Sequence, residues 1–86
     1  MGYRVSLTNQ ARKGLLALPK EHRERIVEAL DSLGQDPFHR VKRLQGSQLF
    51  THRVGEYRII FTFRRSRMLV LVIRIGHRGS VYRGLE

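Results

Sequence analysis

The fold is decided by residues 49–64, which read LFTHRVGEYRIIFTFR. On either side of Gly55-Glu56 this stretch alternates between apolar and polar residues, as strands with one buried face do. A two-residue connection that begins with glycine is typical of a tight β-hairpin. In the second strand, one face would carry Arg58 and the other would carry four apolar side chains: Tyr57, Ile59, Phe61 and Phe63.

The rest of the chain adds one strand at the beginning and one after the hairpin. Residues 3–7 alternate between apolar and polar, which predicts a short first strand. Residues 68–75 are rich in branched apolar side chains, which predicts a last strand. In this last strand we expect one face to be formed by Leu69, Leu71, Ile73 and Ile75.

Two helices are predicted between the first strand and the hairpin, because apolar residues recur there at helical spacing. Thr8 or Asn9 can cap the first helix, Pro19 separates the two, and Gly34 is placed to end the second. The order β-α-α-β-β-β predicts one α+β domain over residues 1–86. We expect a helical hairpin on one face of a mostly antiparallel four-stranded sheet.

The charge of the chain points to an anionic partner. The 86 residues include 17 Lys and Arg against 7 Asp and Glu, for a net charge of +10. Fourteen of the 17 cations are arginine, whose planar fork of donors binds phosphate at two points. Such a field attracts polyanions, which favours nucleic acid or nucleoprotein over a mixed-charge solubility surface.

Several other function classes find no support in the sequence. Cysteine is absent, so the chain has no disulfide and no thiol nucleophile. The four histidines lack metal-ligand spacing, and we expect neither a metal nor a cofactor. Residues 68–73 form an apolar run far too short for a membrane span, and the amino terminus does not resemble a secretion signal. We therefore expect a cytoplasmic protein that binds no membrane.

Arginines gather on the sheet face that the helices would leave open. Fixed cations on such a face can stabilise a phosphate during its reaction, although an ordinary solvated polar face is the alternative. The expected members are Arg53, Arg58, Arg64, Arg74 and Arg78. The irregular segment before the hairpin adds three basic residues that we expect to contact RNA: Arg40, Lys42 and Arg43.

The carboxyl end carries further candidate residues, since residues 75–83 read IGHRGSVYR. Tyr82 can stack on an unpaired base, and His77 can exchange protons near neutral pH. A frayed end with a packed tyrosine is the other interpretation. Glu56 is the acid expected nearest to the arginines.

Several motifs together make the chain resemble the RelE/ParE superfamily of toxins, closest to RelE. The hairpin and terminal motifs in combination are the specific part of this resemblance. The motifs are Pro37-Phe38, VKRLQG at 41–46, RVGEYRIIF at 53–61, IGHR at 75–78 and Val81-Tyr82. The resemblance implies a toxin of a type II toxin–antitoxin pair that is a monomer when free. It also implies a hetero-oligomer with a RelB-like protein antitoxin.

RelE-like toxins enter the A site of a 70S-type ribosome and cut the bound mRNA without a metal. The ribose 2′-hydroxyl attacks the adjacent phosphate and leaves a 2′,3′-cyclic phosphate and a 5′-hydroxyl. By position, the resemblance implies that Arg58 stabilises the phosphate and Arg78 assists the leaving oxygen. It likewise implies that Tyr82 stacks on the mRNA base and that Arg53 contacts the scissile region.

The proton acceptor is a point of departure from the family. Some RelE members have a lysine, thought to act as base, where this chain has Thr51, and threonine cannot take that role. His77 is the preferred candidate, followed by His52 and Glu56; alternatively, the geometry of ribosome-held mRNA supplies the rate without a base.

Two other functions stay open: a ParE-like toxin that poisons DNA gyrase, and an inactive member that only binds RNA or the ribosome. ParE members usually lack the arginines with the terminal tyrosine, so Arg58, Arg78 and Tyr82 favour the nuclease.

Overall fold

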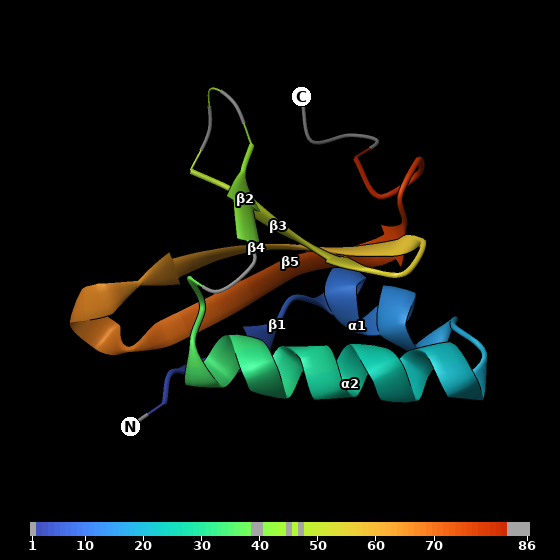
Figure 1. The fold of residues 1–86 in the computed structure, drawn as a ribbon, viewed down its shortest axis with the longest axis horizontal. Helices are drawn as coiled ribbons and strands as arrows, with labels where there is room; N and C mark the ends of the chain where they lie inside the picture. Colours follow the sequence, from blue (N-terminus) through green and yellow to red (C-terminus); the bar gives the residue numbers. More distant parts are fainter. Residues whose placement is uncertain (1, 39–40, 45, 47, 83–86) are drawn as a thin grey trace.

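The structure, a computed structural model, describes residues 2–38, 41–44, 46 and 48–82. Its strands form one sheet in the order β1-β5-β4-β3-β2, in which β1 runs parallel to β5 and the other neighbours are antiparallel. Both helices cover one face of this sheet (Figure 1). The elements are β1 (Arg4–Leu7), α1 (Asn9–Leu16), α2 (Lys20–Gln35), β2 (Val41–Arg43), β3 (Phe50–Val54), β4 (Tyr57–Arg64), the short 3-10 helix η1 (Arg65–Arg67) and β5 (Leu69–His77).

The α+β class and the helical hairpin on one face are confirmed, whereas the strand count is wrong by one. The added strand, β2, lies in the segment that was expected to be irregular, and it pairs with β3 through Val41 opposite His52. Three residues, two of them charged, alternate too briefly to predict a strand from sequence. The strand forms because the outer edge of β3 offers it backbone partners.

The predicted hairpin is present with the predicted turn. Val54 lies opposite Tyr57, so Gly55-Glu56 is a two-residue connection. Gly55 has a φ of 61°, a left-handed conformation that glycine adopts without steric cost. In β4 the predicted alternation also holds, since Ile59 and Phe61 are fully buried in the core beneath the helices.

A β-bulge divides the single face that was expected to hold Leu69, Leu71, Ile73 and Ile75 in β5, so that expectation is wrong. Ile60 lies opposite Arg74 and Phe61 opposite Val72, so Ile73 is the extra residue. The side chains of β5 that enter the core are therefore Val70, Val72 and Ile75. The bulge also turns Arg74 to the same face as Ile60.

The first helix lies close against the last strand. The Thr8 hydroxyl donates to the Ile73 carbonyl at 2.7 Å and accepts from the Ala11 N–H, so Thr8 is the cap of α1. A Cβ on Gly14 would overlap the Ile75 carbonyl oxygen. Gly34, expected to end α2, lies within it, and the helix runs on to Gln35.

The opposite side of the sheet carries no helix, and we call it the open face. It is defined by Arg58, Ile60, Thr62 and Arg64 of β4 and by the residues directly opposite them on the neighbouring strands. The turn formed by residues 78–82 lies on this side of the sheet (Figure 1). Among the described residues, no helix is long and apolar enough to cross a membrane.

Candidate functional site

Two arginines face each other across the hairpin at one end of the open face. Arg53 of β3 lies directly opposite Arg58 of β4. The Arg53 Nε donates to the Gly55 carbonyl at 3.3 Å, and the Arg58 Nη1 donates to the Tyr57 carbonyl at 3.3 Å. Like charges directly opposite each other destabilise a sheet. An anion held between them would remove that repulsion, so the pair is suited to binding phosphate.

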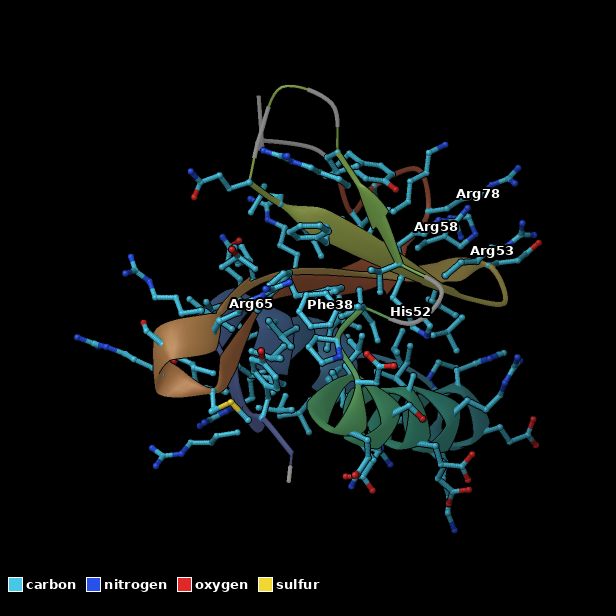
Figure 2. The ribbon with its side chains drawn as sticks, turned by 60° about the vertical axis from the view of Figure 1, so that its left-hand side comes forward. Phe38, His52, Arg53, Arg58, Arg65 and Arg78 are labelled. Atoms are coloured by element: carbon cyan, nitrogen blue, oxygen red, sulfur yellow. The ribbon has the colours of Figure 1, made fainter. Side chains whose placement is uncertain are left out.

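Arg78 joins this pair through the backbone. Its N–H donates to the Glu56 carbonyl at 2.9 Å, which fastens the chain beyond β5 to the tip of the hairpin. Figure 2 shows the side chains of Arg53, Arg58 and Arg78 at the same corner of the molecule. We call these three residues the hairpin cluster.

A second row of residues crosses the open face beside the hairpin cluster. Lys42 lies opposite Thr51, Thr51 opposite Ile60, and Ile60 opposite Arg74. The register therefore brings two more cations, Lys42 and Arg74, to this end of the sheet. The sequence had indicated both residues, but only the pairing of four strands puts them in one row.

The terminal turn covers part of this row. The Tyr82 hydroxyl lies 3.4 Å from the Thr51 hydroxyl. Ile60 is fully buried although it points to the open face, and Val81 is 4% exposed. Tyr82 is thus held on the same face as Arg58. Its contact with Thr51 could not be foreseen from sequence, because the two residues are 31 positions apart.

Two of the predicted site residues, Arg64 and Arg43, do not join the hairpin cluster. Arg64 ends β4 six residues after Arg58, about 20 Å away at the usual rise of a strand. Arg43 lies opposite Phe50, on the face that packs against the helices. Arg40 lies outside the described residues.

His77, a candidate base, lies on the helix side of the sheet. It is opposite Tyr57, with ring centroids 6.0 Å apart, and its Nε2 is 3.7 Å from Glu56 Oε2. Arg58 points to the other face, so the structure does not bring His77 and Arg58 together. Glu56 itself is 80% exposed at the hairpin tip.

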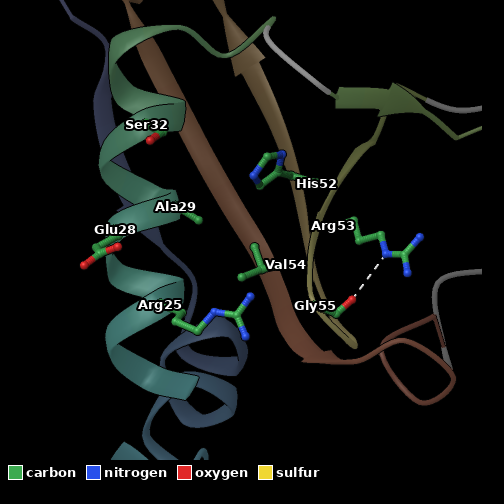
Figure 3. A pocket seen from close by; sticks show the side chains of 8 residues that line it. All are labelled: Arg25, Glu28, Ala29, Ser32, His52, Arg53, Val54 and Gly55. Atoms are coloured by element: carbon green, nitrogen blue, oxygen red, sulfur yellow. Dashed lines mark hydrogen bonds between the residues drawn. The ribbon is translucent and has the colours of Figure 1, made fainter. Parts of the chain in front are cut away.

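His52 also lies on the helix side, opposite Ile59. It lines a cleft of about 470 Å³ between α2 and β3, together with Arg25 and Ser32. Figure 3 shows that His52 and Arg53 leave β3 on opposite sides. Arg53 of the hairpin cluster also lines this cleft, whereas His52 leaves β3 on the side of α2, as the alternation of the strand predicts.

The hairpin cluster can bind and polarise a phosphodiester without a metal ion. Within the described ranges, no three His, Asp or Glu side chains gather closely enough to hold a metal. Guanidinium groups keep their charge at any physiological pH, so they supply fixed positive charge and hydrogen-bond donors but no proton acceptor.

Comparison with known proteins places this chain in a toxin family. A family model described as the ParE toxin of the type II toxin–antitoxin system parDE matches residues 5–82. Toxin RelG from Mycobacterium tuberculosis is 31% identical over an alignment of 86 positions, which covers 96% of this chain and 99% of RelG. The chain therefore belongs to the RelE/ParE superfamily of toxins of type II toxin–antitoxin systems.

Solved structures agree with this assignment. A chain in the toxin–antitoxin complex RelBE2 from Mycobacterium tuberculosis superimposes with a TM-score of 0.82 and 28% identity, covering 91% of this chain and 100% of that one. A chain in the archaeal RelE–RelB complex from Pyrococcus horikoshii gives a TM-score of 0.80 and 32% identity, covering 92% and 98%.

Proposed function

We propose that this toxin is a metal-independent endoribonuclease that enters the A site of a 70S-type ribosome and cuts the bound mRNA, which inhibits translation. One observation carries the proposal: Arg53 and Arg58 oppose each other, with Arg78 at the same corner. Three guanidinium groups around one point are suited to a phosphate that gains negative charge as it reacts. Tyr82 on the same face adds a surface on which a base can stack.

In the proposed reaction, the ribose 2′-oxygen forms a bond to the adjacent phosphorus while the bond from phosphorus to the 5′-oxygen breaks. Arg53 and Arg58 donate to the non-bridging oxygens. Arg78 donates to the 5′-oxygen as it leaves. The 2′-hydroxyl loses a proton and the 5′-oxygen gains one, so the products are a 2′,3′-cyclic phosphate and a 5′-hydroxyl with no water consumed.

We further propose that no side chain of the toxin acts as an obligatory base. His52 and His77 both lie on the helix side, and an arginine cannot release its proton under physiological conditions. The 2′-proton passes to water, and the rate comes from holding the 2′-oxygen in line with the phosphorus. Stabilisation of charge by the arginines adds to that positioning.

Cell-free translation tests the activity. The purified toxin is added to a translating extract, and primer extension maps cuts on the translated mRNA and on the same mRNA without ribosomes. We expect cuts within the A-site codon of the translated mRNA and far fewer on free mRNA. Intact mRNA at arrested ribosomes would instead identify an inactive ribosome-binding member.

Inhibition of DNA gyrase is the second candidate, because the matching family model is described as a ParE toxin. Supercoiling by purified gyrase, measured with the same toxin preparation, separates the two activities. A gyrase poison would block supercoiling and leave translation and mRNA intact. The hairpin cluster with Tyr82 favours the nuclease.

The proposed partner is a RelB-like antitoxin. We propose that the free toxin is a monomer and that it forms a hetero-oligomer with this antitoxin. Two of the solved relatives are an archaeal RelE–RelB complex and the RelBE2 complex. A net charge of +10 with an open sheet face favours an acidic segment that folds as it binds. Co-expression with the product of the adjacent gene, followed by size-exclusion chromatography, should give one complex; two separate peaks would contradict this partner.

A further inference from the structure

A second group of arginines lies at the opposite end of the sheet from the hairpin cluster. Arg64 ends β4, and Arg65 and Arg67 follow it in η1. Arg4 of β1 also belongs to this group, because Leu69 of β5 pairs with Arg4 on one side and with Arg64 on the other. All four side chains are exposed. We call these four residues the distal cluster.

The backbone beneath the distal cluster is well fastened. Met68 closes the turn in a left-handed conformation with a φ of 49°, and its N–H donates to the Arg65 carbonyl at 3.2 Å. The Met68 carbonyl in turn accepts from the Arg4 N–H at 2.8 Å. These bonds hold β1 and the turn together, so the arginines are presented from a fixed frame.

An exposed phenylalanine sits within reach of the distal cluster. The Arg65 guanidinium carbon lies 4.9 Å from the centre of the Phe38 ring, and Phe38 is 45% exposed. Phe63 packs edge-on against Phe38 at 4.8 Å, and Tyr3 does so at 6.4 Å. Figure 2 shows Arg65 and Phe38 away from the corner that holds the hairpin cluster. Stacking on an aromatic ring pre-orients the guanidinium and leaves its donors free for an anion.

Few acidic groups offset this charge. Residues 57–85 contain no Asp or Glu. Asp36 lies beside Phe38, where its Oδ1 accepts the Phe38 N–H at 3.0 Å. Arg4 and Arg64 point to the open face, whereas Arg65 lies against Phe38 on the helix side. The four cations give this end of the sheet a positive potential that attracts a polyanion.

We propose that the distal cluster is a second RNA-backbone site, which anchors the RNA away from the point of cleavage. This inference rests on the proposed function in taking RNA as the polyanion. Between the two clusters the open face offers uncharged residues such as Thr62 and Leu71. The separation of about 20 Å corresponds to roughly six stacked nucleotides at 3.4 Å each. Binding energy at the distal cluster can then be used to position the phosphate at the hairpin cluster.

A length series of labelled single-stranded RNA tests the proposal by fluorescence anisotropy. We expect a clear gain in affinity between oligonucleotides of about 4 and about 8 nucleotides, because only the longer ones reach both clusters. The double variant Arg65→Gln/Arg67→Gln should lose this gain. Two lost phosphate contacts should reduce the salt slope by about 1.4 and the affinity by about 10- to 30-fold at 0.1 M salt.

A matched control removes the same charge elsewhere. Arg12→Gln/Arg23→Gln alters two arginines on the helices, outside both clusters, and should retain the length dependence. Arg65→Lys/Arg67→Lys should restore most of the salt slope. Equal affinities and equal salt slopes for the distal and helix variants would overturn the proposal. It would also be overturned if the wild type bound acidic lipid vesicles in preference to RNA and the distal variant lost that binding.

Sedimentation with 70S ribosomes identifies the source of the RNA. Weaker binding of the distal variant to empty ribosomes supports ribosomal RNA as the anchor, whereas a defect seen only with ribosomes carrying mRNA supports the message itself. These readouts do not depend on cleavage. If the wild type cuts mRNA but shows no length-dependent gain in RNA affinity, only the distal site is rejected. If it shows that gain but does not cut mRNA, only the nuclease is rejected.

Discussion

The hydroxyl oxygens of Thr51 and Tyr82 lie 3.4 Å apart, which joins the middle of β3 to the last described residue of the chain. Beside them, Ile60 is fully buried on a sheet face that carries no helix. The Thr51 hydroxyl contacts the residue proposed to stack on the base. We therefore expect Thr51 to act as a positioning residue for Tyr82.

The Thr51–Tyr82 contact predicts non-additive kinetics. Thr51→Val and Tyr82→Phe should each lower kcat/KM for ribosome-dependent cleavage by about 2- to 10-fold, the effect of one hydrogen bond. The double variant should be no worse than either single one. Thr51→Ser, which keeps the hydroxyl, should cut like the wild type. Fully additive losses would show that the two hydroxyls act independently.

The stacking role of Tyr82 predicts a larger loss when its ring is removed. Tyr82→Ala should weaken binding of the mRNA in the A site by about 5- to 100-fold, as stacking on one base contributes about 1–3 kcal/mol. Tyr82→Phe keeps the ring and should lose no more than the 2- to 10-fold expected for its hydroxyl. The measurement is KM for cleavage of mRNA in programmed ribosomes. An alanine variant with unchanged KM and a lowered kcat would assign Tyr82 to the chemical step instead.

The hairpin cluster predicts a loss of catalysis without a loss of docking. Arg58→Ala and Arg78→Ala should each lower kcat by about 100- to 1000-fold, because each removes a donor to developing charge. Sedimentation with ribosomes should change little, since most of the toxin's cations remain. Arg12→Ala on α1 is the matched control and should cut normally. If both cluster variants cut at the wild-type rate, the site lies elsewhere.

The position of His77 on the helix side of the sheet predicts that its removal has little effect on cleavage. His77→Ala should keep its cleavage rate within a few-fold, because His77 faces Tyr57 and Glu56 and not the arginines. Its exposed ion pair contributes less than about 1 kcal/mol to stability, so urea unfolding should also change little. The test is a pH–rate profile of both proteins. A profile that loses a step near neutral pH, together with a hundredfold lower kcat, would assign His77 as the base.

Close packing of α1 on β5 predicts a stability defect. Gly14→Ala would push its new Cβ into the Ile75 carbonyl oxygen, and overpacking of this kind costs about 1–3 kcal/mol. Urea unfolding followed by circular dichroism measures the change. Gly79→Ala is the matched control, because a Cβ there meets open space. Equal midpoints for the two variants would mean that α1 can shift away from the strand.

The parts of the fold that sequence predicted correctly are those with local causes. The alternation of β4 predicted its buried face, Gly55 predicted the turn, and Thr8 predicted the helix cap. The main errors concern strand pairing. The bulge at Ile73 divides the expected face of β5, and β2 exists because an edge of β3 was open to it.

The same distinction applies to the candidate site. Sequence alone determined that the chain carries an excess of arginine and that Arg58 lies on the side of its strand that faces away from the core. Tertiary structure decided which cations meet, because the register of four strands brings Lys42 and Arg74 toward Arg58 and leaves Arg64 at the far end. Propensity and alternation act between neighbours in the chain, whereas hydrogen bonding between strands joins residues far apart in it, and only the folded sheet fixes those pairs.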